Sequence, residues 1–146
     1  MTDHRQEPGL GVLLFVAYRA LETRAYEAVA AAGGDITLAQ ARIASRIGPD
    51  GTRLSDLAEQ ARVTKQSAGF LVDQLAAAGY VERVPDPSDG RARLVRLTAR
   101  AQEVVALANA EVERTLGEWR AHVGAERLAA VEETLRELRE VVDPWA

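Results

Sequence analysis

Apolar residues recur with the period of a helix near the start of the chain. From Leu10 to Ala32 they return every three or four positions, and the pair Gly33 and Gly34 then ends the repeat. This pattern predicts a long first helix over 10–32. Thr37 and Gln40 next form a capping box, in which each side chain bonds the backbone of the other residue, and this predicts a second helix running to about Ile47.

Two more helices are predicted in the middle of the chain, with three residues between them. The first covers Leu54 to Gln60. Thr64 can cap the second, whose apolar positions Ala68, Leu71, Val72 and Leu75 share one face, and Gly79 stops it. Two helices joined by so short a turn are typical of a helix-turn-helix.

The residues after Gly79 have the pattern of a β-hairpin. The segments 80–84 and 93–97 alternate and are rich in β-branched residues, whereas 86–90 has the composition of a turn. A hairpin in this place is the wing of a winged helix-turn-helix. The predicted fold class is therefore α+β, mainly α with a small β-hairpin.

Two long helices are predicted after the wing. Thr98 can cap the first, and Gly124 separates it from the last, whose apolar residues step by three and four positions. Such a narrow seam packs against another helix, and we expect a second copy of the chain to supply it. The residues predicted for this homodimer interface are Leu10, Leu13, Leu128, Val131, Leu135, Leu138, Val142 and Trp145.

A chain of 146 residues has the size of one domain. We expect a single domain over 1–146, with a reading head at about 37–98 and dimerisation helices at about 10–32 and 99–142. No apolar run is long enough to span a membrane, and the segment Met1 to Gly9 has no features of an export signal. These features predict a cytoplasmic protein without a membrane partner.

The net charge of −4 conceals an uneven distribution along the chain. Residues 42–100 carry a net charge of +3, whereas residues 1–41 and 101–146 carry −2 and −5. A basic segment between acidic flanks is the pattern expected where a protein contacts nucleic-acid phosphates.

The sequence lacks the residues that disulfides, metal sites and common enzyme active sites require. The chain has no cysteine, which excludes disulfides and thiolate metal sites. His4 and His122 lie far apart outside any ligand spacing, so we predict no metal and no cofactor. The acidic residues of the C-terminal half have no His, Cys or glycine-rich partner, and we therefore do not expect an enzyme.

The exposed face of the helix after Thr64 carries side chains that suit the major groove of DNA. Gln66 can pair with adenine, Lys65 can reach phosphate or guanine, and Ser67 can bond phosphate. Gly69 allows the backbone to approach closely. For Phe70 two interpretations remain open, contact with a thymine methyl group or packing against the base of the wing.

In the wing, Asp89, Arg91 and Arg93 alternate near the tip of the hairpin. This spacing can send an arginine into the minor groove while a carboxylate fixes its rotamer, although such a run can also be a solvated charged loop. The complete set predicted to contact DNA is Arg62, Thr64, Lys65, Gln66, Ser67, Gly69, Phe70, Asp89, Arg91 and Arg93.

These segments resemble the multiple-antibiotic-resistance regulator (MarR) family of bacterial repressors. The resemblance is carried by 64–67 (Thr-Lys-Gln-Ser), 79–83 (Gly-Tyr-Val-Glu-Arg) and the Asp-Pro-x-Asp-x-Arg-x-Arg run of 86–93, and it extends by pattern to the flanking helices. It implies an intertwined dimer with recognition helices in successive major grooves and wings in flanking minor grooves. Arg62, where the family usually has Gly, and Phe70, where it often has a polar base-reader, depart from its pattern.

The resemblance also implies an effector, often phenolic or lipophilic, bound between the dimer helices and the reading head. Phe15, Tyr18 and Arg42 are candidate lining residues, although the aromatic rings can equally be ordinary core. We therefore predict a repressor that binds a pseudo-palindromic operator in double-stranded DNA and is released by a small effector. The alternative is a winged-helix protein-interaction module without DNA binding.

Overall fold

The computed structural model describes residues 7–145, so the expectation for His4 lies outside the described residues. This part of the chain contains six helices and one three-stranded antiparallel sheet, which confirms the predicted fold class. In chain order, the elements are α1 (Leu10–Ala31), α2 (Leu38–Ala44), β1 (Thr52–Arg53), α3 (Leu54–Ala61), α4 (Lys65–Ala77), β2 (Val81–Asp86), β3 (Asp89–Leu97), α5 (Ala99–Val123) and α6 (Ala125–Val142).

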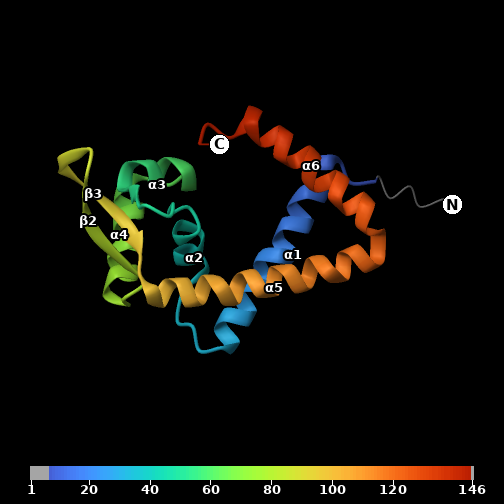
Figure 1. The fold of residues 1–146 in the computed structure, drawn as a ribbon, viewed down its shortest axis with the longest axis horizontal. Coiled ribbons are helices and arrows are strands. Elements are labelled where there is room, and N and C mark those ends of the chain that lie inside the picture. Colours follow the sequence, from blue (N-terminus) through green and yellow to red (C-terminus); the bar gives the residue numbers. More distant parts are fainter. Residues whose placement is uncertain (1–6, 146) are drawn as a thin grey trace.

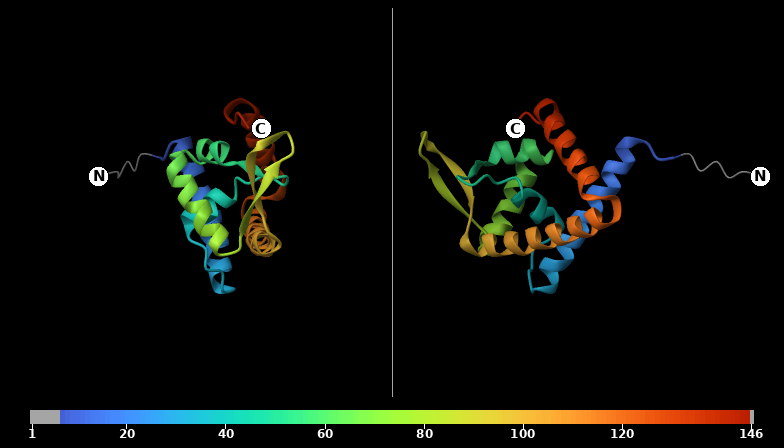
Figure 2. Two further views of the ribbon diagram at one scale, coloured as in Figure 1. Left: turned by 90° about the vertical axis from the view of Figure 1, so that its left-hand side faces the viewer. Right: turned by 45° about the vertical axis from the view of Figure 1, so that its right-hand side comes forward.

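The elements divide the molecule into two ends (Figure 1). The reading head, made of α2, α3, α4 and the wing strands β2 and β3, occupies one end. Helix α5 runs from the base of the wing to the other end, where α6 turns back, and α1 packs across α5. In the right-hand view of Figure 2, the wing projects at the end remote from the corner between α5 and α6. No helix among residues 7–145 combines the length and apolar character that a membrane span requires.

Side-chain caps begin three of the helices at the predicted threonines. The Thr37 hydroxyl accepts from the Gln40 amide at 3.2 Å, while the Gln40 side chain accepts from the Thr37 amide at 3.0 Å. Thr64 and Thr98 cap α4 and α5 with the hydroxyl alone, which accepts from the amides of Ser67 and Ala101. Helix α2 ends at Ala44, earlier than the predicted Ile47, because the chain tightens there into two i to i+3 hydrogen bonds.

The sheet is larger than the predicted hairpin. Strands β2 and β3 extend further toward each other than expected, and β1, which was not predicted, pairs with β3 through Thr52 opposite Val95 and Arg53 opposite Leu94. The strand order is β1-β3-β2. The short strand β1 thereby fixes the start of α3 to the centre of the wing.

The core of the reading head contains most of the predicted apolar face of α4. Ala68, Val72 and Leu75 are buried together with Leu57 and Ala58 of α3, whereas Leu71 is only partly buried. Burying this face orients α4, so that its opposite face points away from the protein.

Arg62, between α3 and α4, adopts a left-handed backbone conformation with φ 54° and ψ 43°. It is the one non-glycine residue with positive φ in residues 7–145. A side chain in this conformation costs about 1–2 kcal/mol. The conformation of Arg62 therefore lowers the stability of the fold.

Replacing Arg62 by glycine should raise the free energy of unfolding by about 0.5–1 kcal/mol, since glycine relieves the strain but loses more entropy on folding. Urea denaturation measures this difference. Arg62→Ala is the matched control, because it removes the same side chain but keeps the strain. An equal effect of the two substitutions would show that the backbone conformation is not the cause.

Candidate nucleic-acid interface

The exposed face of α4 starts with three polar residues in its first turn. Lys65, Gln66 and Ser67 are all exposed. The Thr64 hydroxyl donates to Ser67 Oγ at 2.8 Å, so these two side chains are ordered together at the helix start. The N-terminal end of a helix attracts phosphate oxygens, because backbone amides and the helix dipole point toward them.

Phe70 lies one turn further along the same face and is 63% exposed. The alternative that its ring packs against the base of the wing is therefore wrong. Helix α4 contacts the wing instead through an ion pair: Nη2 of Arg83 in β2 lies 2.6 Å from Asp73 Oδ1 of α4. At Gly69 an added Cβ would lie 3.7 Å from Leu54 Cδ2, an ordinary contact, so internal packing does not require glycine there.

Arg91 and Arg93 of the wing are exposed, and neither forms an ion pair within residues 7–145. Asp89 does not hold either guanidinium, contrary to the expectation of a fixed rotamer. Its Oδ1 accepts from the Arg91 backbone amide at 3.1 Å, and its Oδ2 lies 4.0 Å from Arg53 Nη2. The carboxylate shapes the hairpin turn, and both arginines remain available to a ligand.

The acid that anchors the wing is Asp86, which sequence reasoning missed. Asp86 is 6% exposed, and its carboxylate accepts from the Ser88 hydroxyl and amide at 2.7 and 2.8 Å, and from Arg53 Nη2 at 2.7 Å. The two bonds from Ser88, followed by those from Arg53, lower the pKa of Asp86 to about 2. The Asp-x-Ser spacing of an Asx turn was the signal that could have found it.

Because the pKa of Asp86 falls from 3.8 to about 2 on folding, its ionised form stabilises the fold. This contribution should be complete above pH 4 and should disappear as the pH falls toward 2. We expect Asp86→Asn to unfold at lower urea concentrations than the unsubstituted protein at pH 7, with the difference shrinking between pH 4 and 2. A difference that stays constant over this range would contradict the assignment.

The remaining arginine of the outer wing surface is neutralised. Arg96 of β3 donates to Glu82 of β2, with Nη2 to Oε1 at 2.7 Å. It therefore provides an internal comparison for Arg93, which lies on the same strand without such a partner.

A cavity of about 510 Å³ lies behind the reading head, between α1, α2 and α5. Most of its wall is apolar. Of the three candidate effector residues, Tyr18 and Arg42 line it. Phe15 does not, because its ring is 58% exposed and lies beside the Arg19 guanidinium at 5.6 Å. The lining residues of α1 are Tyr18, Leu21, Glu22, Ala25, Tyr26 and Val29, and those of α5 are Ala101, Val104, Val105, Ala108, Asn109 and Val112.

An ion pair stands at the edge of this cavity. Arg42 Nε and Nη2 donate to the two oxygens of Glu22 at 2.7 and 2.9 Å, and the Tyr18 hydroxyl donates to the same carboxylate at 3.1 Å. The bonds from Arg42 lower the pKa of Glu22, and the bond from Tyr18 lowers it further, whereas burial acts in the opposite direction. The cationic group beside the cavity is therefore already neutralised by a protein carboxylate.

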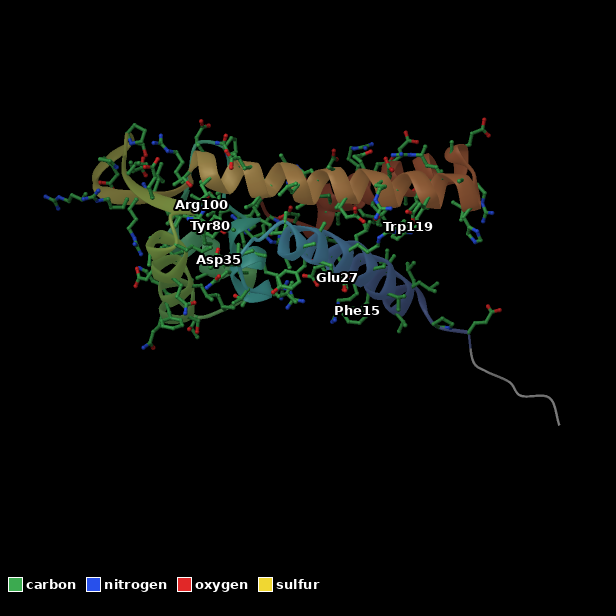
Figure 3. The ribbon with its side chains drawn as sticks, turned by 90° about the horizontal axis from the view of Figure 1, so that it is seen from below. Phe15, Glu27, Asp35, Tyr80, Arg100 and Trp119 are labelled. Atoms are coloured by element: carbon green, nitrogen blue, oxygen red, sulfur yellow. The ribbon has the colours of Figure 1, made fainter. Side chains whose placement is uncertain are left out.

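Tyr80, which also lines the cavity, ties it to the reading head (Figure 3). Its hydroxyl donates to Asp35 Oδ1 at 2.6 Å, and the Arg100 guanidinium lies 4.7 Å from the centre of its ring. The bond to Tyr80 is the main reason that the pKa of Asp35 is lowered. The three side chains join the loop after α1, the end of α4 and the start of α5.

The helices outside the reading head expose a large apolar surface. Leu10 and Leu13 of α1 are 69% and 52% exposed, and the predicted seam of α6 is open except at Leu128, which is 8% exposed. Leu128 packs within its own chain and is not free to meet a partner. The seam residues that remain open are Val131, Leu135, Leu138 and Val142, with Trp145 beyond them.

His122 is exposed, and no group of three or more His, Cys, Asp or Glu in residues 7–145 is placed to hold a metal ion. Two of the acidic residues of the C-terminal half form ion pairs with an arginine of α1. Glu111 and Glu118 of α5 lie 3.2 and 2.6 Å from the guanidinium of Arg24 and thus link α5 to α1.

Comparison with known proteins supports the resemblance. The sequence model of the MarR family matches residues 34–92. Among solved structures, a transcriptional regulator from Thermotoga maritima is 26% identical with a TM-score of 0.66, covering 91% of this chain and 93% of its own. NadR in complex with 4-hydroxyphenylacetate is 25% identical with a TM-score of 0.69, and the alignment covers 94% of this chain and 97% of NadR.

A mutant MarR from E. coli complexed with operator DNA is 25% identical with a TM-score of 0.64, and the alignment covers 88% of this chain and 92% of that one. None of the curated proteins matches the sequence. The winged helix-turn-helix fold is thus shared along nearly the whole chain, whereas the family match is confined to the reading head.

Proposed function

We propose that this chain is a transcriptional regulator of the MarR family that binds a pseudo-palindromic DNA operator as a homodimer, and the family match of its reading head supports this proposal. The observation that carries this proposal is the pairing state of its basic side chains. Arg53, Arg83 and Arg96 are bound to carboxylates, whereas Arg91 and Arg93 are exposed without an ion pair in the described chain.

The free arginines and the polar start of α4 lie at one end of the molecule (Figure 1). Exposed arginines on a hairpin suit phosphate or minor-groove contacts, while Gln66 and Lys65 suit base edges in the major groove. A solved neighbour of this fold, the mutant MarR from E. coli, is complexed with operator DNA. These features support the same use of the reading head here.

The proposal of a dimer rests on the exposed apolar residues of α1 and α6. A monomeric protein rarely leaves so continuous an apolar surface in water. A two-fold pair of reading heads would address two half-sites about one helical turn apart, roughly 34–36 Å. We further propose that the bound dimer represses transcription by occupying its operator.

The direct test is selection of DNA by the purified full-length protein from a library of random duplexes, followed by a mobility-shift titration of the selected sequences. We expect a selected site with two-fold symmetry and an affinity that falls steeply as salt rises. No retention of DNA at low salt would reject DNA binding and favour the protein-interaction module. A reporter gene carrying the selected site would then distinguish repression from activation.

We also propose that the cavity behind the reading head binds a small effector. Its volume and apolar wall suit a compact aromatic molecule, and NadR, a neighbour of the same fold, is in complex with 4-hydroxyphenylacetate. Because Glu22 already neutralises Arg42, a ligand carboxylate gains little charge compensation at this edge. We therefore expect an uncharged phenol to bind more tightly than a phenol that carries a carboxylate.

Adding 4-ethylphenol should weaken binding to the selected duplex at lower concentrations than 4-hydroxyphenylacetate. Ala108→Trp, which fills the cavity, should abolish this response, whereas Ala106→Trp on the outer face of α5 should retain it. Fluorescence anisotropy of labelled duplex measures both responses. A response that survives Ala108→Trp unchanged would place the effector elsewhere, and a lower effective concentration for the carboxylate would contradict the role given to Glu22.

A further inference from the structure

The exposed apolar side chains of this protein are unevenly distributed. Within residues 7–145, the exposed large hydrophobic residues lie on α1, α5, α6 and the segment after α6. Val63 and Phe70 are the two exceptions. Val63 is 39% exposed and Phe70 is 63% exposed. Phe70 is thus the one large apolar side chain that the reading head holds mostly in solvent.

Phe70 lies on the face of α4 that points away from the core. Its helix neighbour Gln66, one turn earlier, is exposed, whereas Ala68, Val72 and Leu75 bury the opposite face. Phe70 belongs neither to the core cluster of the described residues nor to the hydrophobic residues that pack against this core. The ring therefore projects from the face that carries the candidate base-reading residues.

The position of the ring is fixed by rigid surroundings. Helix α4 is held to α3 by its buried face, and Asp73, three residues after Phe70, is bonded to Arg83 of the wing. The phenylalanine side chain has only two rotatable bonds, so ordering it on a ligand costs little entropy. An apolar group held in this way suits a specific apolar partner.

The dimer surface does not account for this exposure. In Figures 1 and 2, α4 and the wing lie at the end of the molecule away from the α5–α6 corner, and the exposed apolar residues of α1 and α6 belong to the other part of the fold. In the major groove of DNA, thymine alone presents a methyl group, and an aromatic ring can contact it. The partner that fits Phe70 is therefore a base edge.

We propose that Phe70 is a specificity-determining residue that recognises the methyl group of a thymine in each half-site. This inference rests on the proposed function, since it requires α4 to enter the major groove. Gln66, one turn away, would pair with a neighbouring base, so that one hydrogen-bonding and one apolar contact together define the half-site.

The experiment uses the duplex selected by the full-length protein and replaces each thymine in turn by uracil, which removes only the methyl group. At one pair of symmetry-related positions, uracil should weaken binding about fourfold for one methyl and tenfold or more for both. The Phe70→Ala variant should bind the thymine and uracil duplexes within twofold of each other. Phe70→Leu, which stays apolar, should keep part of the preference.

Gln74→Ala is the matched control, because Gln74 is also exposed on α4 but bonds to Gln40. It should discriminate thymine from uracil as the unsubstituted protein does. Phe70 is exposed, so its substitution should leave the thermal unfolding midpoint unchanged, and this verifies that each variant is folded.

The inference would be overturned if uracil had no effect at any position, or if Phe70→Ala kept the full preference for thymine. Failure to select any duplex would instead reject the proposed function, and the inference with it. The two failures are therefore distinguished by whether a bound duplex exists before any thymine is replaced.

Discussion

Replacing Leu135 by glutamate should convert the proposed dimer into monomers at micromolar concentration and weaken binding to the selected duplex at least a hundredfold. Leu135 lies at the centre of the open seam of α6 and is 42% exposed in the single chain. Burying such a side chain stabilises an interface by about 1.5–3 kcal/mol. In a two-fold dimer this stabilisation is lost at two symmetry-related positions. The charge adds a desolvation cost at the same place.

The loss of DNA affinity follows from the loss of linkage between two reading heads. In a dimer, binding of one head presents the other at a high effective concentration near its half-site, which strengthens binding by a factor of about 10²–10⁴. Sedimentation velocity measures the oligomeric state, and anisotropy measures the affinity.

Ala129→Glu is the matched control, since Ala129 is exposed on the opposite face of α6. It introduces the same charge on the same helix and should leave both the dimer and its DNA binding intact. A Leu135→Glu protein that stays dimeric would show that the seam is not the interface.

The double substitution Arg91→Ala and Arg93→Ala should weaken binding to selected and random duplexes alike, by about a hundredfold at moderate salt. These guanidinium groups have no ion-pair partner in the described chain, so removing them leaves no carboxylate unpaired. Each phosphate contact contributes about 0.9 to the slope of log affinity against log salt. With two wings per dimer, the slope should become flatter by about 2–4 units.

Arg96→Ala provides the comparison for the wing, because Arg96 lies on β3 but is bonded to Glu82. It should change the salt slope by less than one unit. An unchanged affinity of the double variant, or an equal effect of Arg96→Ala, would contradict the assignment of the wing to DNA contact.

Local signals predicted the parts of the fold that depend on neighbouring residues. The caps at Thr37, Thr64 and Thr98 are found where expected, because a side chain satisfying an amide three residues later is a property of the sequence itself. The packing of α3 on α4 also followed from apolar spacing, since helices joined by a short turn have few ways to bury their faces.

The features that were missed depend on residues distant in the chain. Strand β1 exists only because Thr52 and Arg53 pair with β3, more than forty residues later in the chain. The sequence of a two-residue segment does not indicate such pairing. Likewise, the spacing of Leu128 within the seam cannot reveal whether its own α5 or a partner covers it. In the structure, its own chain does.

The candidate site divides in the same way. The exposed residues of α4 and the free arginines of the wing were predicted from their positions, but the buried Asp86 and its bond to Arg53 required the folded sheet. Of the three residues proposed for an effector pocket, Tyr18 and Arg42 line the cavity, whereas Phe15 lies on an outward face of α1. Helical periodicity alone could not separate these faces, because α1 is apolar on several of them.

Hydroxyl-radical footprinting of the selected duplex shows how many reading heads contact the DNA. We expect two protected segments related by two-fold symmetry and centred about one helical turn apart on one face of the DNA, with a stoichiometry of two chains per duplex. Protection of the outer minor grooves should disappear with the double substitution in the wing. A single protected segment, or one chain per duplex, would contradict a dimer with two reading heads.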